Sequence, residues 1–238
     1  MFKRVFIFLN SLILFNCFTT VGFHDKKLRE SISFGEVQDL KVCVLYENSL
    51  NMDEIEELEN HWKEELDLYK LNLIFSKKIK IERKSFWSWD LMEELESYKL
   101  GAKCDRILYL VGRKWQDIAF ETFAITLAIV LGIKAEIQGA VETSTNTRGY
   151  IKAKYVSLLQ LFFTSPKSTL VHEGYHLLGC PHALWKDECY VTIKKLKEEN
   201  KNNKDKDKIF ASKSLYSKQL IIESRSVNSF FKSNLDLE

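Results

Sequence analysis

Three of the chain's five histidines lie within residues 169–182, which read TLVHEGYHLLGCPH. His172 and His176 are four positions apart, so in a helix of 3.6 residues per turn both imidazoles leave from one face. A Zn²⁺ ion takes its ligands in a tetrahedral array, and two histidines at this spacing supply two of the corners. The spacing therefore favours a metal site.

The residues around this pair indicate what a metal would do there. Glu173 follows the first histidine, and in the HExxH arrangement this glutamate accepts a proton from the water that attacks the substrate. Gly179 is placed to end the helix, after which the chain returns through Cys180 and Pro181 to His182. Three histidine ligands leave one coordination position for water, which is the pattern of a catalytic zinc site.

Two other interpretations stay open. The histidines could be incidental side chains on a surface helix or satisfied groups in a core, with no metal at all. A structural zinc site would instead need a fourth ligand, for which Cys180 and Cys189 are the candidates. Neither interpretation gives Glu173 a role, so a hydrolytic site is the favoured one.

The eleven residues from His172 to His182, HEGYHLLGCPH, resemble the zinc-binding signature of the metzincin metallopeptidases. The resemblance implies that His172, His176 and His182 bind zinc and that Glu173 is the general base. It also implies a twisted, mostly parallel sheet with an active-site helix, followed by a small irregular C-terminal subdomain. Peptide substrates would then pair with the edge strand of a hairpin within residues 138–156.

The sequence departs from the family at one point. Metzincins have a methionine in a tight turn beneath the zinc, downstream of the third histidine. Here methionine occurs only at positions 1, 52 and 92. Asp187-Glu188-Cys189-Tyr190-Val191 could replace that turn, with Val191 as its apolar residue.

The elements that must position the site follow from hydrophobic patterning. Strands are expected at 41–47, about 73–83 and 105–112, and helices between them, which predicts an α/β (α+β) domain with a largely parallel sheet. In the first of these helices apolar residues recur at helical spacing: Ile55, Leu58, Trp62, Leu66 and Tyr69. A short helix is expected at about 89–99, a buried helix or strand pair at 118–133, and two strands at about 138–143 and 149–156. Ser165-Pro166 is a start signal for the histidine helix, which is expected to run to Leu178.

The amino terminus is typical of an export signal. Lys3 and Arg4 precede an apolar run from Val5 to Phe18 that is too short to span a bilayer comfortably. Leu14-Phe15-Asn16-Cys17 resembles a bacterial lipobox, so Cys17 is a candidate for lipidation. The alternatives are an uncleaved anchor or a simple signal peptide. We expect an exported protein, either a membrane-anchored lipoprotein or a secreted or periplasmic one.

Export affects how the other cysteines are interpreted. Cys43, Cys104, Cys180 and Cys189 form an even set that is compatible with two disulfides in an oxidising compartment. Three pairings exist and sequence does not choose among them. Free buried thiols are an equal alternative.

Composition and charge complete the expected organisation. With 35 basic and 33 acidic residues the net charge is +2, which argues against a nucleic-acid partner. We expect a signal peptide at 1–17, a linker or short pro-like segment at 18–40, a metallopeptidase-like domain at 41–191, and a charged linker and tail at 192–238. Within the last part, residues 194–208 are expected to be a solvated loop or disordered linker, and the tail beyond is expected to form one or two helices.

Two functions from different classes are consistent with these observations. The first is an exported zinc metalloendopeptidase that acts on a protein or peptide substrate. The alternative is a non-catalytic surface lipoprotein in which zinc holds a binding module together.

Overall fold

A computed structural model of the chain describes residues 24–84, 90–101, 103–119, 123, 138–154, 165–183, 185–202, 209–213 and 223–237. The described helices include α2 (Lys26–Ser31), α3 (Met52–Asp67), α4 (Asp90–Glu96), α7 (Pro166–Leu177), α8 (Asp187–Asn202) and α9 (Ser224–Phe230), and residues 115–119 are also helical. The described strands are β1 (Gln38–Glu47), β2 (Leu71–Ile81), β3 (Arg106–Val111), β4 (Gly139–Val141) and β5 (Arg148–Lys152).

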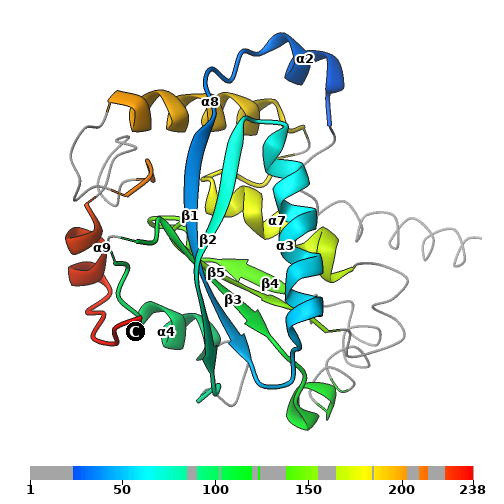
Figure 1. Cartoon of the computed structure of the whole chain (residues 1–238), viewed down its shortest axis with the longest axis vertical. Coiled ribbons are helices and arrows are strands. Elements are labelled where there is room, and N and C mark those ends of the chain that lie inside the picture. Colours follow the sequence, from blue (N-terminus) through cyan, green and yellow to red (C-terminus); the bar gives the residue numbers. More distant parts are fainter. Residues whose placement is uncertain are drawn as a thin grey trace, which may run out of the picture.

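The five strands form one sheet in the order β2-β1-β3-β5-β4 (Figure 1). All neighbouring pairs are parallel except β4 and β5, which are antiparallel. This mixed α/β architecture with a mostly parallel sheet confirms the fold class predicted from the alternation of strands and helices.

The sheet separates two hydrophobic cores because successive residues of a strand point to opposite faces. On one face, Val42 and Val44 of β1 pack with residues of α3 and α7. On the other, Cys43 and Leu45 pack with Leu91 and Leu95 of α4. Helices α3 and α7 lie side by side on the first face, so the histidine helix rests on α3 and on the sheet (Figure 1).

The predicted elements occur close to their expected positions. Helix α3 buries Ile55, Leu58, Trp62 and Leu66, the stripe expected from the spacing, and begins with a capping box between Asn51 and Glu54. The strands, the short helix α4 and the hairpin of β4 and β5 are also confirmed. Most of the apolar stretch 118–133 lies outside the described residues.

The prediction of a solvated loop over 194–208 was wrong for its first half. Helix α8 continues to Asn202, and the predicted boundary at residues 191 and 192 lies inside it. Tyr190, Ile193, Leu196 and Lys197 recur at helical spacing and are buried, although charged residues surround them. Residues 203–208 lie outside the described part, and the division into domains stays a prediction.

The two ends of the described chain also pack on the domain. Residues 26–31 of the expected linker form α2, and residues 38–40 already belong to β1. One tail helix, α9, is present as expected, and Tyr98 forms an isolated bridge with Leu235. None of the described helices combines the length and apolar composition that crossing a bilayer would require. Residues 1–17, including Cys17, lie outside the described part.

Candidate metal centre

Helix α7 carries the first two histidines, and local sequence signals define both of its ends. Its first residue is Pro166, and the Ser165 side chain accepts a hydrogen bond from the Ser168 backbone nitrogen. At the other end Gly179 has a φ of +81°, a conformation that glycine adopts without steric cost. Gly179 N donates to His176 O and Cys180 N donates to Tyr175 O, which is the Schellman pattern of a helix end.

Close packing fixes the position of α7. A Cβ atom on Gly174 would lie 2.3 Å from the indole nitrogen of Trp62, so glycine is what lets α7 approach α3 this closely. The buried Arg106 guanidinium donates through Nε to the carbonyl of Leu177, the last residue of the helix, at 2.7 Å. The helix is therefore held both along its face and at its end.

The structure brings the three predicted ligands together. The Nε2 atoms of His172 and His176 lie 3.2 Å apart. Two nitrogens at tetrahedral angles around one zinc ion would be separated by about 3.3 Å. His182 completes a group in which all three ligand atoms lie within 4.8 Å of one another. Its ring centroid lies 4.2 Å from that of His176 and 5.4 Å from that of His172.

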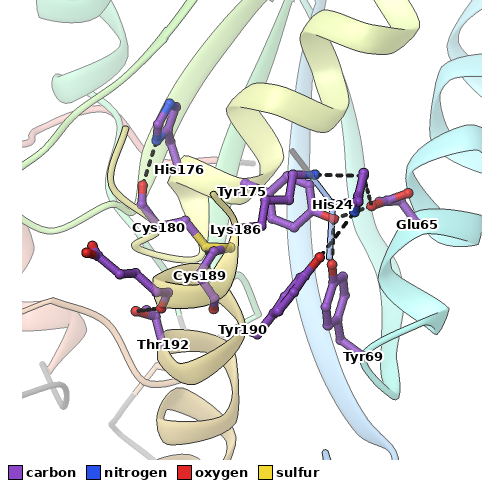
Figure 2. The surroundings of a disulfide bond; sticks show 11 residues. His24, Glu65, Tyr69, Tyr175, His176, Cys180, Lys186, Cys189, Tyr190 and Thr192 are labelled. Atoms are coloured by element: carbon purple, nitrogen blue, oxygen red, sulfur yellow. Dashed lines mark hydrogen bonds and ion pairs between the residues drawn. A yellow bond between two sulfur atoms is a disulfide. The ribbon is translucent and has the colours of Figure 1, made fainter. Parts of the chain in front are cut away.

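A backbone carbonyl orients the second of these histidines. His176 Nδ1 lies 2.7 Å from the Cys180 carbonyl oxygen, and a carbonyl can only accept (Figure 2). In the neutral imidazole Nδ1 therefore carries the proton, which leaves the lone pair of Nε2 directed at the other two histidines. Histidines that bind metals are commonly fixed by a hydrogen bond of this kind.

Burial also keeps the pair neutral. Desolvation, followed by the neighbouring His176 and His182, lowers the pKa of His172 to about 3. Burial likewise lowers the pKa of His176, although the bond to Cys180 opposes that change. Both side chains are therefore available as neutral ligands at physiological pH.

The disulfides decide between a three-ligand and a four-ligand site in the described structure. Cys180 is bonded to Cys189, and Cys43 to Cys104, so one of the three pairings left open by sequence is present. The sulfurs of Cys180 and Cys189 are therefore committed to each other and neither is available as a thiolate. Among the described residues, the metal-binding group holds the three histidines and no fourth ligand.

Glu173 lies on the side of α7 that faces the sheet edge. It is only 7 % exposed, and burial raises its pKa to about 8. A Cβ atom on Gly139 of β4 would lie 2.7 Å from Glu173 Cγ and 3.1 Å from its Cδ. The side chain predicted to be the general base is thus packed directly against the backbone of the edge strand.

The outer edge of β4 is open to pairing in the described structure. Lys152 N donates to Gln138 O and Glu142 N donates to Arg148 O. Bonded positions alternate in an antiparallel pair, so the N–H and C=O groups of Gly139 and Val141 point away from β5. No described strand pairs with that edge.

Comparisons with known proteins do not assign the chain to a family. No family model matches the chain, and no curated protein matches it. Among solved structures, archaemetzincin from Methanopyrus kandleri is similar with a TM-score of 0.40 and 13% sequence identity, over 69% of this chain and 97% of that one. A likeness of this size carries no argument about activity, so the function is inferred from the site itself.

The segment expected to replace the methionine turn proved to be different. Asp187–Val191 is the first turn and a half of α8, not a tight turn. Val191 is 60% exposed on that helix, so it does not form an apolar floor beneath the histidines. The prediction for Val191 was wrong because the two residues before it, Cys189 and Tyr190, occupy the buried face instead.

A polar cluster next to α7 was missed by sequence reasoning (Figure 2). His24 lies 3.0 Å from Lys186 Nζ and 3.3 Å from the Tyr190 hydroxyl. The hydroxyls of Tyr69 and Tyr175 are 2.7 Å apart, and Tyr175 also donates to Glu65. The members come from four separate segments, so no single spacing in the sequence could have joined them.

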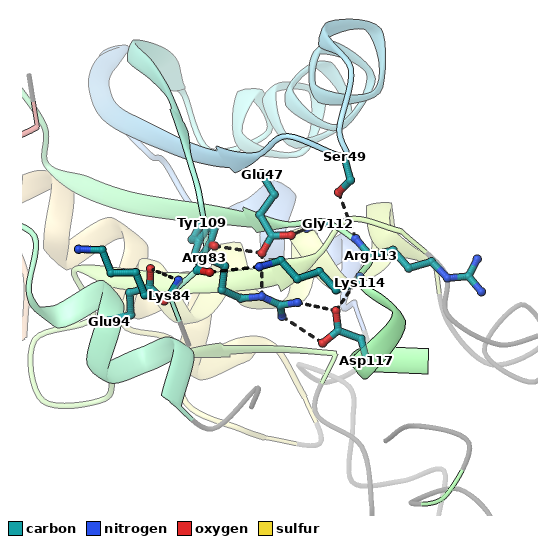
Figure 3. Close-up of polar contacts among 10 residues, drawn as sticks. All are labelled: Glu47, Ser49, Arg83, Lys84, Glu94, Tyr109, Gly112, Arg113, Lys114 and Asp117. Atoms are coloured by element: carbon teal, nitrogen blue, oxygen red, sulfur yellow. Dashed lines mark hydrogen bonds and ion pairs between the residues drawn. The ribbon is translucent and has the colours of Figure 1, made fainter. Parts of the chain in front are cut away.

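A second missed network lies beyond the carboxyl ends of β1 and β3, the end of an open α/β sheet where ligands commonly bind. Arg83 forms a two-bond ion pair with Asp117 and lies 3.0 Å from Glu47 at the end of β1 (Figure 3). Glu47 also accepts hydrogen bonds from Tyr109 and from the backbone nitrogen of Gly112. The buried charges of this network are paired with one another, so the histidine group is the stronger candidate site.

Proposed function

We propose that the chain is a zinc-dependent peptidase. The observation that carries this proposal is the histidine group itself: two Nε2 atoms at 3.2 Å, a third histidine within reach, and a fixed tautomer of His176. A three-histidine set without a fourth described ligand suits a catalytic zinc ion better than a structural one.

His172, His176 and His182 would hold the zinc. Bound there, the ion would supply a Lewis acid for the scissile carbonyl, a lowered pKa for the attacking water, and a positive charge that favours ionised Glu173. Glu173 would accept a proton from that water and pass it to the leaving amine. The buried position of Glu173 limits competition from bulk water for this proton transfer.

The substrate class follows from the sheet edge. An extended peptide can pair with the outward N–H and C=O groups of Gly139 and Val141, as in other cases of strand addition. Glu173 contacts Gly139, so a peptide bound to this edge would lie beside the general base. We therefore propose protein or peptide substrates and no nucleic-acid partner.

The location proposed is outside the cytosol. Two disulfides in one domain support export, because such bonds persist in oxidising compartments. A membrane-anchored lipoprotein lipidated at Cys17, or a secreted or periplasmic protein, stays a prediction from the amino-terminal sequence.

Chelation separates this proposal from a non-catalytic zinc module. The full exported chain would be treated with a chelator. Hydrolysis of an unfolded protein substrate would then be measured, and the tertiary structure of the chain would be monitored in parallel by near-ultraviolet circular dichroism. We expect hydrolysis to stop and to return on zinc addition, while the tertiary signal is largely kept. His182→Ala should lose both zinc and activity, whereas the control His61→Ala, at a half-buried residue of α3 outside the histidine group, should lose neither. Unfolding on chelation, with no hydrolysis before it, would favour the binding module.

A further inference from the structure

His182 is the ligand with the weakest local support. Unlike His172 and His176, it does not lie on α7, and its side chain is exposed. Among the described residues its ring contacts the other two imidazoles and no hydrogen bond holds it. Its position therefore depends on the backbone path of the loop that carries it.

That loop is closed by a disulfide. Cys180 precedes His182 by two residues, and Cys189 lies in the first turn of α8. Their Cα atoms are 4.7 Å apart, and both residues are 2% exposed. The bond thus ties the start of the histidine loop to the buried face of α8 (Figure 2).

The same cysteine also acts on a second ligand. The carbonyl oxygen of Cys180 accepts from His176 Nδ1 at 2.7 Å, the contact that directs Nε2 into the site. The Schellman bonds of the helix end hold the Cys180 N–H but not the direction of its carbonyl. A displacement of Cys180 would therefore affect the tautomer of His176 and the path to His182 together.

The other end of the loop is held independently. Lys186 is buried, lies over the Tyr175 ring at 3.8 Å, and contacts His24 at 3.0 Å. This anchor fixes the loop where it enters α8, four residues beyond His182. On the other side of His182, Cys180 is held by the helix end of α7 and by the disulfide to α8.

We propose that the Cys180–Cys189 disulfide is a positioning element of the metal centre, which sets the tautomer of His176 and the approach of His182. The presence of a metal in this inference rests on the proposed function. The hydrogen bond to His176 rests on the structure alone. Loss of a hydrogen bond that orients a metal-binding side chain weakens metal binding about 10- to 100-fold.

The test compares two disulfides in the full chain. Cys180→Ala/Cys189→Ala removes the bond without leaving a thiol that could bind zinc, and Cys43→Ala/Cys104→Ala is the matched control. The control bond lies in the core on the α4 side of the sheet, away from α7. Zinc affinity is measured by competition with a chelator, and the ring tautomer of His176 by nitrogen-15 NMR of the zinc-free protein.

We expect the first variant to bind zinc about 10- to 100-fold more weakly and to lose the single Nδ1–H tautomer. The control should keep the wild-type affinity and tautomer per folded molecule. Should the alanine pair fail to fold, Cys180→Val/Cys189→Val keeps apolar volume at both buried positions without the bond. Equal affinity and an unchanged tautomer in the folded variant would overturn the inference.

The two readouts also separate this inference from the proposed function. A wild-type chain that binds zinc but cleaves nothing would contradict the peptidase and leave the positioning role intact. A wild-type chain without zinc affinity would contradict the zinc site, and the tautomer comparison would still decide whether the disulfide orients His176.

Discussion

Glu173 lies against the backbone of Gly139, with its Cγ 2.7 Å and its Cδ 3.1 Å from where a Cβ on that glycine would be. Gly139 belongs to edge strand β4, and its own N–H and C=O groups point outward. The contact joins the proposed general base to the strand where a peptide would bind. Any side chain at position 139 would have to displace either Glu173 or the strand.

Gly139→Ala is therefore expected to reduce hydrolysis strongly while leaving zinc stoichiometry unchanged. The new Cβ would also lie 2.8 Å from the Tyr150 carbonyl oxygen, so we expect a loss of about 1–3 kcal/mol in the free energy of unfolding. Urea unfolding measures the loss of stability, zinc analysis measures the stoichiometry, and an assay with an unfolded protein substrate measures the loss of hydrolysis. Gly101→Ala is the control, since a Cβ there has no atom within 4 Å. Wild-type activity in Gly139→Ala would show that Glu173 does not depend on this contact.

Arg106 provides a test of how α7 is anchored. Its buried guanidinium donates to the carbonyls of Leu177, Phe210 and Ala211, at 2.7, 3.2 and 2.9 Å. Arg106→Leu leaves these acceptors unsatisfied, and we expect the free energy of unfolding to fall by at least about 3 kcal/mol. The exposed Arg113→Leu should change it by less than about 0.5 kcal/mol. Equal urea midpoints for the two variants would contradict an anchoring role.

The surroundings of Lys197 lead us to expect that the free energy of unfolding depends on pH in the alkaline range. Its Nζ donates to the carbonyls of Tyr69 and Lys70 at 2.9 Å, and burial lowers its pKa from the ordinary 10.5 to about 8. Between these values the unfolded chain binds more protons, so this residue's contribution to the free energy of unfolding rises with pH. The slope contributed by one group is at most about 1.4 kcal/mol per pH unit.

Lys197→Met should remove this contribution from a series of urea titrations between pH 8 and 10.5. The exposed Lys195→Met, two residues away on the same helix, should keep the wild-type slope. A Lys197→Met chain whose stability follows the wild-type pH dependence would show that Lys197 titrates normally in the folded state.

Local pattern was sufficient to predict that the three histidines lie together. His172 and His176 share a helix face because of the helical period, and Gly179 ends that helix because it alone adopts a positive φ cheaply. These are relationships between near neighbours in the chain. The grouping of the histidines followed from them, whereas the mostly parallel sheet followed from the alternation of strands and helices.

The missed features depend on the path of the chain after α7 and on which face of α8 is buried. The hydrogen bond between His176 and the Cys180 carbonyl could be predicted only if the path of the loop were known. The pairing of Cys180 with Cys189 could be predicted only if the position of α8 were known. Charged composition hid α8 beyond residue 194, because the buried stripe that includes Leu196 and Lys197 is narrow. The composition of a segment averages over all faces of a helix, whereas in α8 only the buried face indicates that the segment packs on the domain.

Glu173→Gln tests the central claim most directly, because it changes the proposed base and leaves all three histidines in place. Zinc content and hydrolysis of an unfolded protein substrate would be measured on the same preparations of wild type, Glu173→Gln and the exposed control Glu188→Gln. We predict one zinc ion per chain in all three and hydrolysis in wild type and the control alone, with activity of Glu173→Gln reduced at least about 100-fold. Wild-type hydrolysis by Glu173→Gln, or the absence of bound zinc in the wild type, would contradict the account.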